Sequence, residues 1–470
     1  MSSKNYSQLI ADYVFQSNGK EMSSRVLHEA KRSLMNYFAV AFASGKDETI
    51  TKAIAVFSRF SADTTASIVG RNTKTDMLNA AALNAMAANV FDFDDTHIPT
   101  IIHPTAPVAS AILALSQTQK ISGSDFLRAL VLGMEIECRI GNAISPMHYS
   151  RGWHITSTCG VFGSAMAAGK LLNLNAQQLN WALGSASAQA SGLVETLGTM
   201  SKSMSVGNAA RNGLLSAILA EQNFTGPDFP LDGERGFLRV FGENPKLESL
   251  LDGLGSQWEV LNNTYKPYPC GVVLNPVIQA CLELHHQFMV MAGKVESIEF
   301  IELTGNPLLR QRTDRPAIRT GRESQVSAQH AVGVSLMRGK AGLAEFSDQA
   351  VNDVAVRALS EKLRFIDDAS MSVDAVKVSF KMRDQAVSEV EVAHAKGSLA
   401  DPLSDFDLEQ KLRELAAYGK NGYQAQALIE QIWAIEKMTD VGQLMLLAAY
   451  SILIFDSRTT LPHLSTSALI

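Results

Sequence analysis

The sequence predicts a mainly α protein, in which a large all-helical domain is interrupted by a smaller α+β lid domain. Apolar residues recur with the helical period of 3.6 through most of the first half of the chain. A period of 2 appears only between residues 295 and 397, and helical patterns return after it. The predicted boundaries are 1–268 and 402–470 for the helical domain and 269–401 for the lid domain.

The helices of the first part follow from the spacing of small and apolar residues. In residues 24–45 the apolar side chains recur at steps of three or four and stop at Gly45. They are Leu27, Ala30, Leu34, Phe38 and Ala41. Similar patterns predict helices at 77–91, 106–119, 124–144 and 162–174. Their many Ala and Gly residues favour close packing of one helix on another.

The predicted strands lie in the lid domain. In residues 374–382, Val376, Val378, Phe380 and Met382 alternate with Lys377, Ser379 and Lys381. Residues 388–397 repeat the alternation after a short connection, so a hairpin is expected, with a third strand at 295–303. Ser404 and Asp407 resemble a capping box before a new helix. The apolar stretch 441–454 predicts a buried last helix that packs on the first domain.

Composition excludes several classes of function. Lys and Arg number 41 against 47 Asp and Glu, and no basic block stands out, so neither nucleic acid nor a membrane surface is an expected partner. The four cysteines contain no C-x-x-C pair, which argues against zinc and fits a reducing cytoplasm. The N-terminus resembles neither a signal nor a transit peptide, and the apolar run 33–45 is shorter than a membrane span.

Polar residues gather in two short stretches. Residues 91–104 hold Asp92, Asp94, Asp95, Thr96, His97 and His103, and residues 148–157 hold His148, Tyr149 and His154. Histidine and carboxylate groups together can move protons near neutral pH. A metal site is the alternative for the first stretch, but its spacing matches no metal motif and no metal is predicted. For Asp94 and Asp95 a capped helix end with solvated carboxylates is favoured.

Two lysines add positive charge to this set. Lys266, in "YKPYPCG", precedes Pro267 and Pro269, which hold the residues after it extended, so its side chain is expected to point in a fixed direction. It suits an anionic ligand or an acid/base role, and a salt bridge at a domain boundary is the alternative. Lys202 lies in a run of small residues, 197–213, without a nucleotide-binding motif.

Five motifs in order resemble the MmgE/PrpD family: "FDFDDTHIPTIIHP", "GWHITSTCGVFGSAMAAGKLLNL", "SKSMSVGNAARNG", "YKPYPCG" and "SAQHAVGVSLMRG". The family includes 2-methylcitrate dehydratase, cis-aconitate decarboxylase and iminodisuccinate epimerase. The resemblance implies a cytosolic homodimer that needs no cofactor, with its site between the helical domain and the lid and a small polycarboxylate as substrate. It carries over Asp92, Thr96, His103, His154, Lys202 and Lys266 as site residues.

The sequence departs from the family pattern at three positions. Ser205 and Asn275 stand where many members have histidine, and His330 stands where an aromatic residue is common. These three are predicted to contact substrate, together with Thr96. Expulsion of hydroxide needs a positioned acid, so the missing histidines argue against dehydration. Removal of a proton next to a carboxylate needs only a base and cations that hold the enediolate.

The predicted activity is therefore epimerisation of an iminodisuccinate-type amino-dicarboxylate. His154 with Lys266 or Tyr149 would form the base and acid pair, and Lys202 and His103, the latter steadied by Asp92, would bind carboxylates and the enediolate. The alternatives are a hydro-lyase of the 2-methylcitrate dehydratase type and a decarboxylase of the cis-aconitate type. A binding protein that kept the fold without the chemistry is a more distant alternative.

Overall fold

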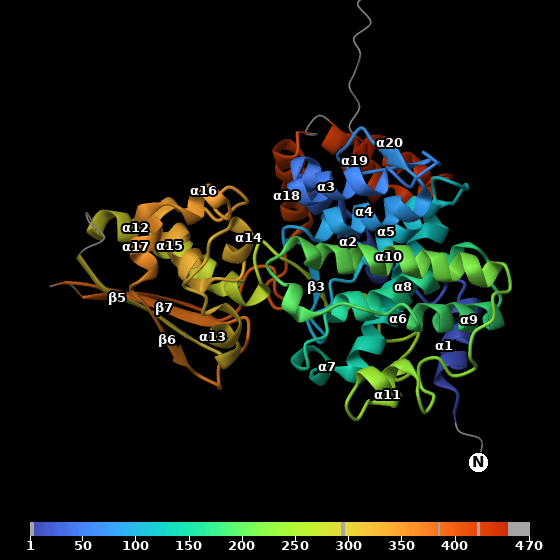
Figure 1. Cartoon of the computed structure of the whole chain (residues 1–470). Coiled ribbons are helices and arrows are strands. Elements are labelled where there is room, and N and C mark those ends of the chain that lie inside the picture. The colour runs from blue at the N-terminus through green and yellow to red at the C-terminus, as the bar shows by residue number, and fades with distance from the viewer. Residues whose placement is uncertain (1–3, 293–296, 384–385, 421–423, 450–470) are drawn as a thin grey trace, which may run out of the picture.

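The computed structural model describes residues 4–292, 297–383, 386–420 and 424–449, and it contains two hydrophobic cores. The larger core joins apolar residues between Tyr6 and Tyr265 with others between Leu403 and Ala448, and it also includes Leu343. The smaller core is formed by residues between Cys270 and Ala395. In Figure 1 the last helices, in red, lie beside the blue helices labelled α3 and α4, while the yellow and orange segments form a separate body with the main sheet. The predicted mainly α class is confirmed.

The larger unit, called the helical unit below, consists of helices from both parts of the chain. They are α1 (Tyr6–Gln16), α2 (Ser24–Ala43), α3 (Glu48–Phe57), α4 (Met77–Asn89), α5 (Thr105–Leu115), α6 (Gly123–Ile144), α7 (Met147–Ser150), α8 (Ile155–Leu171), α9 (Ala176–Ser187), α10 (Met200–Glu221), α11 (Phe237–Phe241), α18 (Asp405–Tyr418), α19 (Ala425–Trp433) and α20 (Gly442–Ala448). The five helices predicted before residue 175 are present as α2, α4, α5, α6 and α8. The predicted capping box of Ser404 and Asp407 begins α18.

Glycine allows α6 and α8 to pack closely at the centre of this unit. A Cβ atom added at Gly133 of α6 would lie 2.7 Å from the carbonyl oxygen of Gly163, and one added at Gly163 of α8 would lie 2.8 Å from that of Gly133. No side chain fits at either position without moving a backbone. The small residues that the sequence places in these helices therefore let the two backbones touch.

The smaller unit, called the α+β unit below, packs helices on a four-stranded sheet. Its helices are α12 (Asn275–Ala292), α13 (Pro307–Thr313), α14 (Gly321–Ser324), α15 (Ala328–Arg338), α16 (Asp348–Val351) and α17 (Val354–Ser360). Its strands are β5 (Ile298–Gly305), β6 (Leu363–Asp367), β7 (Val376–Met382) and β8 (Val387–Val392), in the order β6-β5-β7-β8. The predicted antiparallel hairpin is confirmed as β7 and β8. The sequence missed β6, a short and mostly exposed edge strand that runs parallel to β5.

Two further pairs of short strands and two isolated bridges, one of them between His97 and Ile102, lie in the described residues, and one strand pair positions the site. Strands β1 (Ala66–Ser67) and β2 (Lys74–Thr75) form a small ribbon. Strand β3 (Asp95–His97) pairs antiparallel with β4 (Asn263–Tyr265), so Asp95 lies opposite Tyr265. An isolated bridge joins Trp153 to Leu193. The β3–β4 pair places the stretch that follows Asp92 beside the segment that leads into Lys266, although they are far apart in sequence.

The last predicted helix differs from the prediction. Helix α20 covers only Gly442–Ala448, and although Leu444, Met445 and Ala448 are buried, Leu446 is exposed. The helix therefore buries one face only, and the predicted stretch from residue 450 onward lies outside the described residues. No helix in the described parts of the chain has the length and apolarity needed to cross a membrane.

Candidate active site

A cavity of about 230 Å³ lies between the helical unit and the α+β unit. Its polar lining from the helical unit and the segment after β4 is Asp92, His103, Tyr149, His154, Lys202 and Lys266, the six residues predicted to be catalytic. The α+β unit contributes Gln311, Arg312, Thr313 and Arg315. A larger cavity, of about 740 Å³, is lined by residues that include Pro267 and Lys411 but no histidine. The smaller cavity is therefore the candidate site.

Asp92 lies at the centre of the charged groups. It follows α4 with φ of 52°, a left-handed conformation that aspartate tolerates better than most residues. Its Oδ1 accepts hydrogen bonds from Nζ of Lys202, at 2.8 Å, and of Lys266, at 3.2 Å. Burial would raise the pKa of Asp92, but the two ammonium groups outweigh burial and hold the pKa well below its ordinary value of 3.8. Asp92 is therefore a fixed anion between two cations.

Lys266 is almost completely buried, with 2% of its side chain exposed. Its Nζ donates to the Asp92 carbonyl at 2.9 Å and lies 3.7 Å from Asp94 Oδ1. Burial would lower the pKa of Lys266, but Asp92 and Asp94 reverse this and raise it above 10.5. Its backbone is fixed as well, because Nζ of the buried Lys411 donates to the Lys266 carbonyl at 2.8 Å. Lys266 thus provides a permanent and rigidly held positive charge.

The ring of His103 is oriented by its neighbours in β3. Its Nδ1 lies 2.5 Å from the carbonyl oxygen of Asp95, which can only accept a hydrogen bond, so Nδ1 carries the proton. Thr96 Oγ1 lies 3.4 Å from the same nitrogen. Burial lowers the pKa of His103 against the opposing charges of Asp94 and Asp92. The neutral ring therefore presents the lone pair of Nε2, which is 3.9 Å from Asp92 Oδ1.

His154, directly before α8, belongs to a chain of hydroxyl groups. Ser205 Oγ donates to the carbonyl of Lys202 at 2.8 Å, so it must accept from Ser157 Oγ, at 2.7 Å. Ser157 in turn accepts from His154 Nδ1 at 2.6 Å. Burial, helped by the charge of Lys202, lowers the pKa of His154 to about 3. His154 is therefore neutral, with an unprotonated Nε2 that has no hydrogen-bond partner among the described residues.

Asp94 and Asp95 are buried, which corrects the expectation of solvated carboxylates. After Asp92 the chain turns inward and forms β3, so both side chains enter the interior. Asp94 Oδ2 accepts from Asn89 Nδ2 at 2.7 Å, and Asp95 Oδ2 accepts from Asn263 Nδ2 at 2.7 Å. Burial raises the pKa of Asp95 to about 6.

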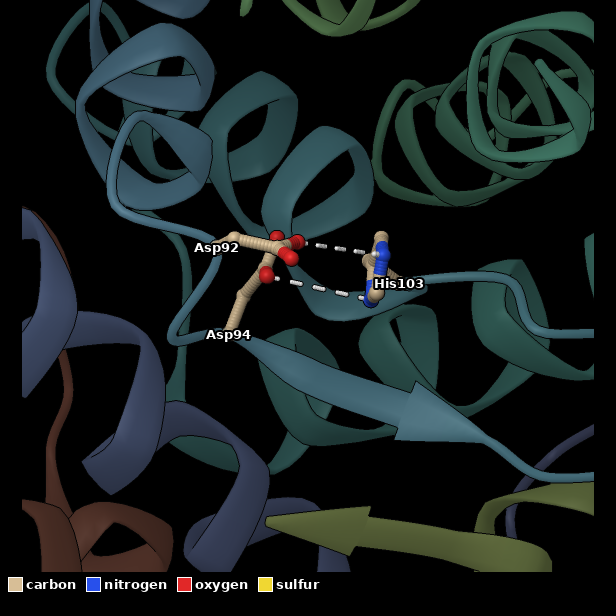
Figure 2. A group of neighbouring side chains, drawn as sticks. All are labelled: Asp92, Asp94 and His103. Carbon is tan, nitrogen blue, oxygen red and sulfur yellow. Dashed lines mark ion pairs between the residues drawn. The ribbon is translucent and has the colours of Figure 1, made fainter. Parts of the chain in front are cut away.

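Asp92, Asp94 and His103 form a group whose possible ligand atoms lie within 4.8 Å of one another (Figure 2). Carboxylate and imidazole are suitable ligands for several divalent cations. However, the ammonium of Lys266 already lies near both carboxylates, and Lys202 binds Asp92. A divalent ion would have to displace or approach these positive charges. The group is better suited to hold lysines than a metal, and the absence of a metal requirement stays a prediction.

The four predicted substrate-binding residues occupy different positions. Thr96 and Ser205 lie directly behind His103 and His154, as described above, and neither lines the cavity. Asn275 begins α12, where its Oδ1 lies 3.6 Å from Cys270 Sγ. His330 lies in α15 away from the cavity, with Nε2 2.7 Å from the Glu345 carbonyl. Its ring therefore holds a loop of the α+β unit together.

The sequence reasoning missed the contribution of the α+β unit. Arg312 and Arg315 follow β5 within "NPLLRQRTDRP", where closely spaced arginines after a strand were the only available signal. Arg312 Cζ lies 5.2 Å from the ring centroid of Tyr149, a cation–π contact between the two units. Ser157 was also missed, because its role depends on a neighbour 48 positions later in the chain.

Comparison with known proteins supports the same family in both units. The MmgE/PrpD N-terminal domain matches residues 8–250, and the MmgE/PrpD C-terminal domain matches residues 268–435. The chain is 26% identical to "Cis-aconitate decarboxylase-like protein oryM" of Aspergillus oryzae, over 93% of this chain and 96% of the relative. It is 25% identical to cis-aconitate decarboxylase of Aspergillus terreus, over 90% and 92%. It is 26% identical to cis-aconitate decarboxylase of Mus musculus, over 90% and 89%.

Proposed function

We propose, because this chain belongs to the MmgE/PrpD family, that it is a cofactor-independent lyase that removes CO₂ from a small polycarboxylic acid of the cis-aconitate type. The sequence alone favoured epimerisation and kept decarboxylation as an alternative. The names of the relatives support this alternative better: two are cis-aconitate decarboxylases, one is named cis-aconitate decarboxylase-like, and each matches at least 90% of this chain.

The observation that carries the proposal is the charge of the cavity wall. Lys202, Lys266, Arg312 and Arg315 line the cavity, and Asp92 is the only carboxylate that lines it in the described part of the chain. Such an excess of positive charge in a partly buried site favours a ligand with several negative charges. A tricarboxylate would balance it.

The same residues suit the chemistry of decarboxylation. When the bond between carbon and the departing carboxylate breaks, its electron pair moves into the system conjugated with a remaining carboxylate. Lys202 and Lys266 would stabilise this charge as fixed cations. A proton must then be added to carbon. Bound carboxylates raise the pKa of a nearby imidazole, so His154 would take up a proton with substrate and give it to the carbanion.

Epimerisation remains the second candidate, because two neutral imidazoles line the cavity from different segments. His103 follows β3 and His154 precedes α8, and each presents an unprotonated Nε2. One could remove a proton next to a carboxylate while a protonated group on the other side returns one. Tyr149 is a weaker candidate for this acid, because burial raises its pKa.

Incubation of the purified protein with cis-aconitate in D₂O tests the proposal. We expect release of CO₂ and one deuterium in the product, observed by NMR. If CO₂ is absent and an iminodisuccinate-type acid instead exchanges its α-proton and loses optical activity, the epimerase reading replaces the lyase. Absence of both reactions would contradict the two candidates together.

A further inference from the structure

Two arginines of the α+β unit, Arg312 and Arg315, line the cavity. Three other arginines of this unit have carboxylate partners: Arg310 pairs with Asp367 at 3.3 Å, Arg322 with Asp47 at 2.8 Å and Arg338 with Asp353 at 2.8 Å. Among the described residues, no carboxylate lies within ion-pair distance of Arg312 or Arg315. An unpaired guanidinium in a cavity wall is a site for an anion.

Asp314, the residue before Arg315, is bound by an amide and does not pair with the Arg315 guanidinium. Gln329 of α15 accepts from the backbone N–H of Arg315 at 3.1 Å through Oε1 and donates to Asp314 Oδ1 at 2.6 Å through Nε2. Ser327 Oγ donates to the Arg315 carbonyl at 2.8 Å. The backbone is thus fixed and the Asp314 carboxylate is held by an amide.

Arg312 is positioned from the opposite side. It is half-buried and lies over the ring of Tyr149, with Cζ 5.2 Å from the ring centroid. Tyr149 belongs to α7 of the helical unit, so the contact joins the two walls of the cavity. The planar guanidinium is held against an aromatic face, which leaves its edge for hydrogen bonds.

We propose that Arg312 and Arg315 form a second anion subsite, which binds a substrate carboxylate distant from the one held by Lys202 and Lys266. The subsite would select acids with three carboxylates over acids with two. The inference rests on the proposed function, since it assumes a polycarboxylate in this cavity. Arg312 and Arg315 would then distinguish substrates by their number of carboxylates.

Binding of two unreactive acids tests the subsite without turnover. Tricarballylate and glutarate share one carbon chain and differ by the central carboxylate. Calorimetry at low ionic strength should show tricarballylate binding at least about tenfold more tightly to the unchanged protein, the effect of one charged hydrogen-bonding contact. In the double variant Arg312→Gln with Arg315→Gln the ratio should fall below about threefold. Arg364 is an exposed arginine on β6, outside the cavity. The control Arg364→Gln also removes an arginine charge, and it should keep the ratio.

The outcomes separate this inference from the proposed function. If the ratio is near one in the unchanged protein, or persists in the double variant, or if tricarballylate does not bind at millimolar concentration, the subsite is overturned. If the ratio behaves as expected but cis-aconitate releases no CO₂, the subsite stands and the lyase reaction does not. Thermal unfolding of each variant confirms that the compared proteins are folded.

Discussion

At the scale of single residues, the site is defined by which groups are charged before any ligand arrives. Asp92 is ionised, Lys266 is a cation, and His154 is neutral, and burial together with near neighbours fixes each state. Burial in a low-dielectric interior makes such interactions stronger than they are in water. Lys266, which precedes the two prolines of "YKPYPCG", therefore acts as a fixed charge and is poorly suited to be a base.

Removal of either the Lys266 ammonium or the His154 imidazole should lower turnover. We expect Lys266→Met and His154→Gln each to lower kcat by about 10² or more, the usual scale for a lost electrostatic or acid/base group. Lys396→Met, which changes an exposed lysine paired with Asp407, is the control and should keep the activity of the unchanged protein. Wild-type kcat in both site variants would remove these residues from the mechanism.

The hydroxyl chain under His154 predicts its tautomer and its titration. Nitrogen NMR of labelled protein should show the Nδ1–H form of His154 and no protonation between pH 8 and 5, since its pKa is about 3. Ser205→Ala removes the acceptor of the Ser157 hydroxyl, so the proton should redistribute between the two ring nitrogens. His154→Gln assigns the signal. An ordinary titration near pH 6.5 would contradict the buried, neutral ring.

The charged group around Asp92 predicts independence from metals. Its carboxylate is already bound by two lysines, so activity should survive dialysis against EDTA. Turnover is compared before dialysis, after it, and after addition of Mg²⁺, Mn²⁺ or Fe²⁺. Loss of activity with EDTA and its return with one of these ions would show that Asp92, Asp94 and His103 hold a metal.

At the scale of elements, the β3–β4 pair and the packing of α6 on α8 position the segments that carry the site residues. The contact between glycines leaves Glu137 of α6 completely buried, and neither of its carboxylate oxygens has a hydrogen-bond partner in the described chain. Burial, and then the charge of Asp95, raises its pKa well above 4.5. Glu137 is therefore protonated in the fold and ionised in the unfolded chain at neutral pH.

This difference predicts the sign of a pH effect on stability. The folded state binds more protons than the unfolded state above pH 4.5, so the contribution of Glu137 is complete below that pH and declines as pH rises. Glu137→Gln has no such dependence. Its melting temperature relative to the unchanged protein should increase from pH 4.5 to pH 8. A constant difference for Glu137→Gln would contradict its protonated state.

At the scale of the whole molecule, two cores form the two walls of one cavity. Polar contacts contribute to the connection between the units: Arg322 of α14 donates to the Val90 carbonyl at 3.0 Å and pairs with Asp47 at the start of α3. Polar contacts between units are compatible with relative motion. The arginines of one unit and the lysines of the other line this same cavity.

The family resemblance predicts a two-fold pair of chains. Light scattering at micromolar concentration should give twice the 50.8 kDa mass of one chain. A C₂ pair buries the same surface on both chains. If that surface is apolar, added salt should leave the mass unchanged, because salt screens interactions between charges. A mass of one chain under these conditions would contradict the dimer.

Much of the fold could be predicted from the local periodicity of apolar residues in the sequence. Helical periodicity gave α2, α4, α5, α6 and α8, and alternation gave β7 and β8, because a helix or strand with one buried face repeats that face in sequence. Edge strand β6 was missed, since three of its five residues are exposed and no alternation survives. Burial of Asp94 and Asp95 was missed as well, because it follows from the turn at Asp92 and from the pairing of β3 with β4.

For the site, the motifs were enough to identify the family and six of the polar residues that line the cavity, because these residues lie in motifs that are continuous in the chain. The protonation states and the partners of these residues depend on the folded structure. It joined Asp92 to Lys202 and Lys266 and linked Ser205 to His154 through Ser157. It also brought Arg312 and Arg315 across from the other unit. Charge state depends on burial and on neighbours within a few ångströms, and those neighbours come from segments that only folding brings together.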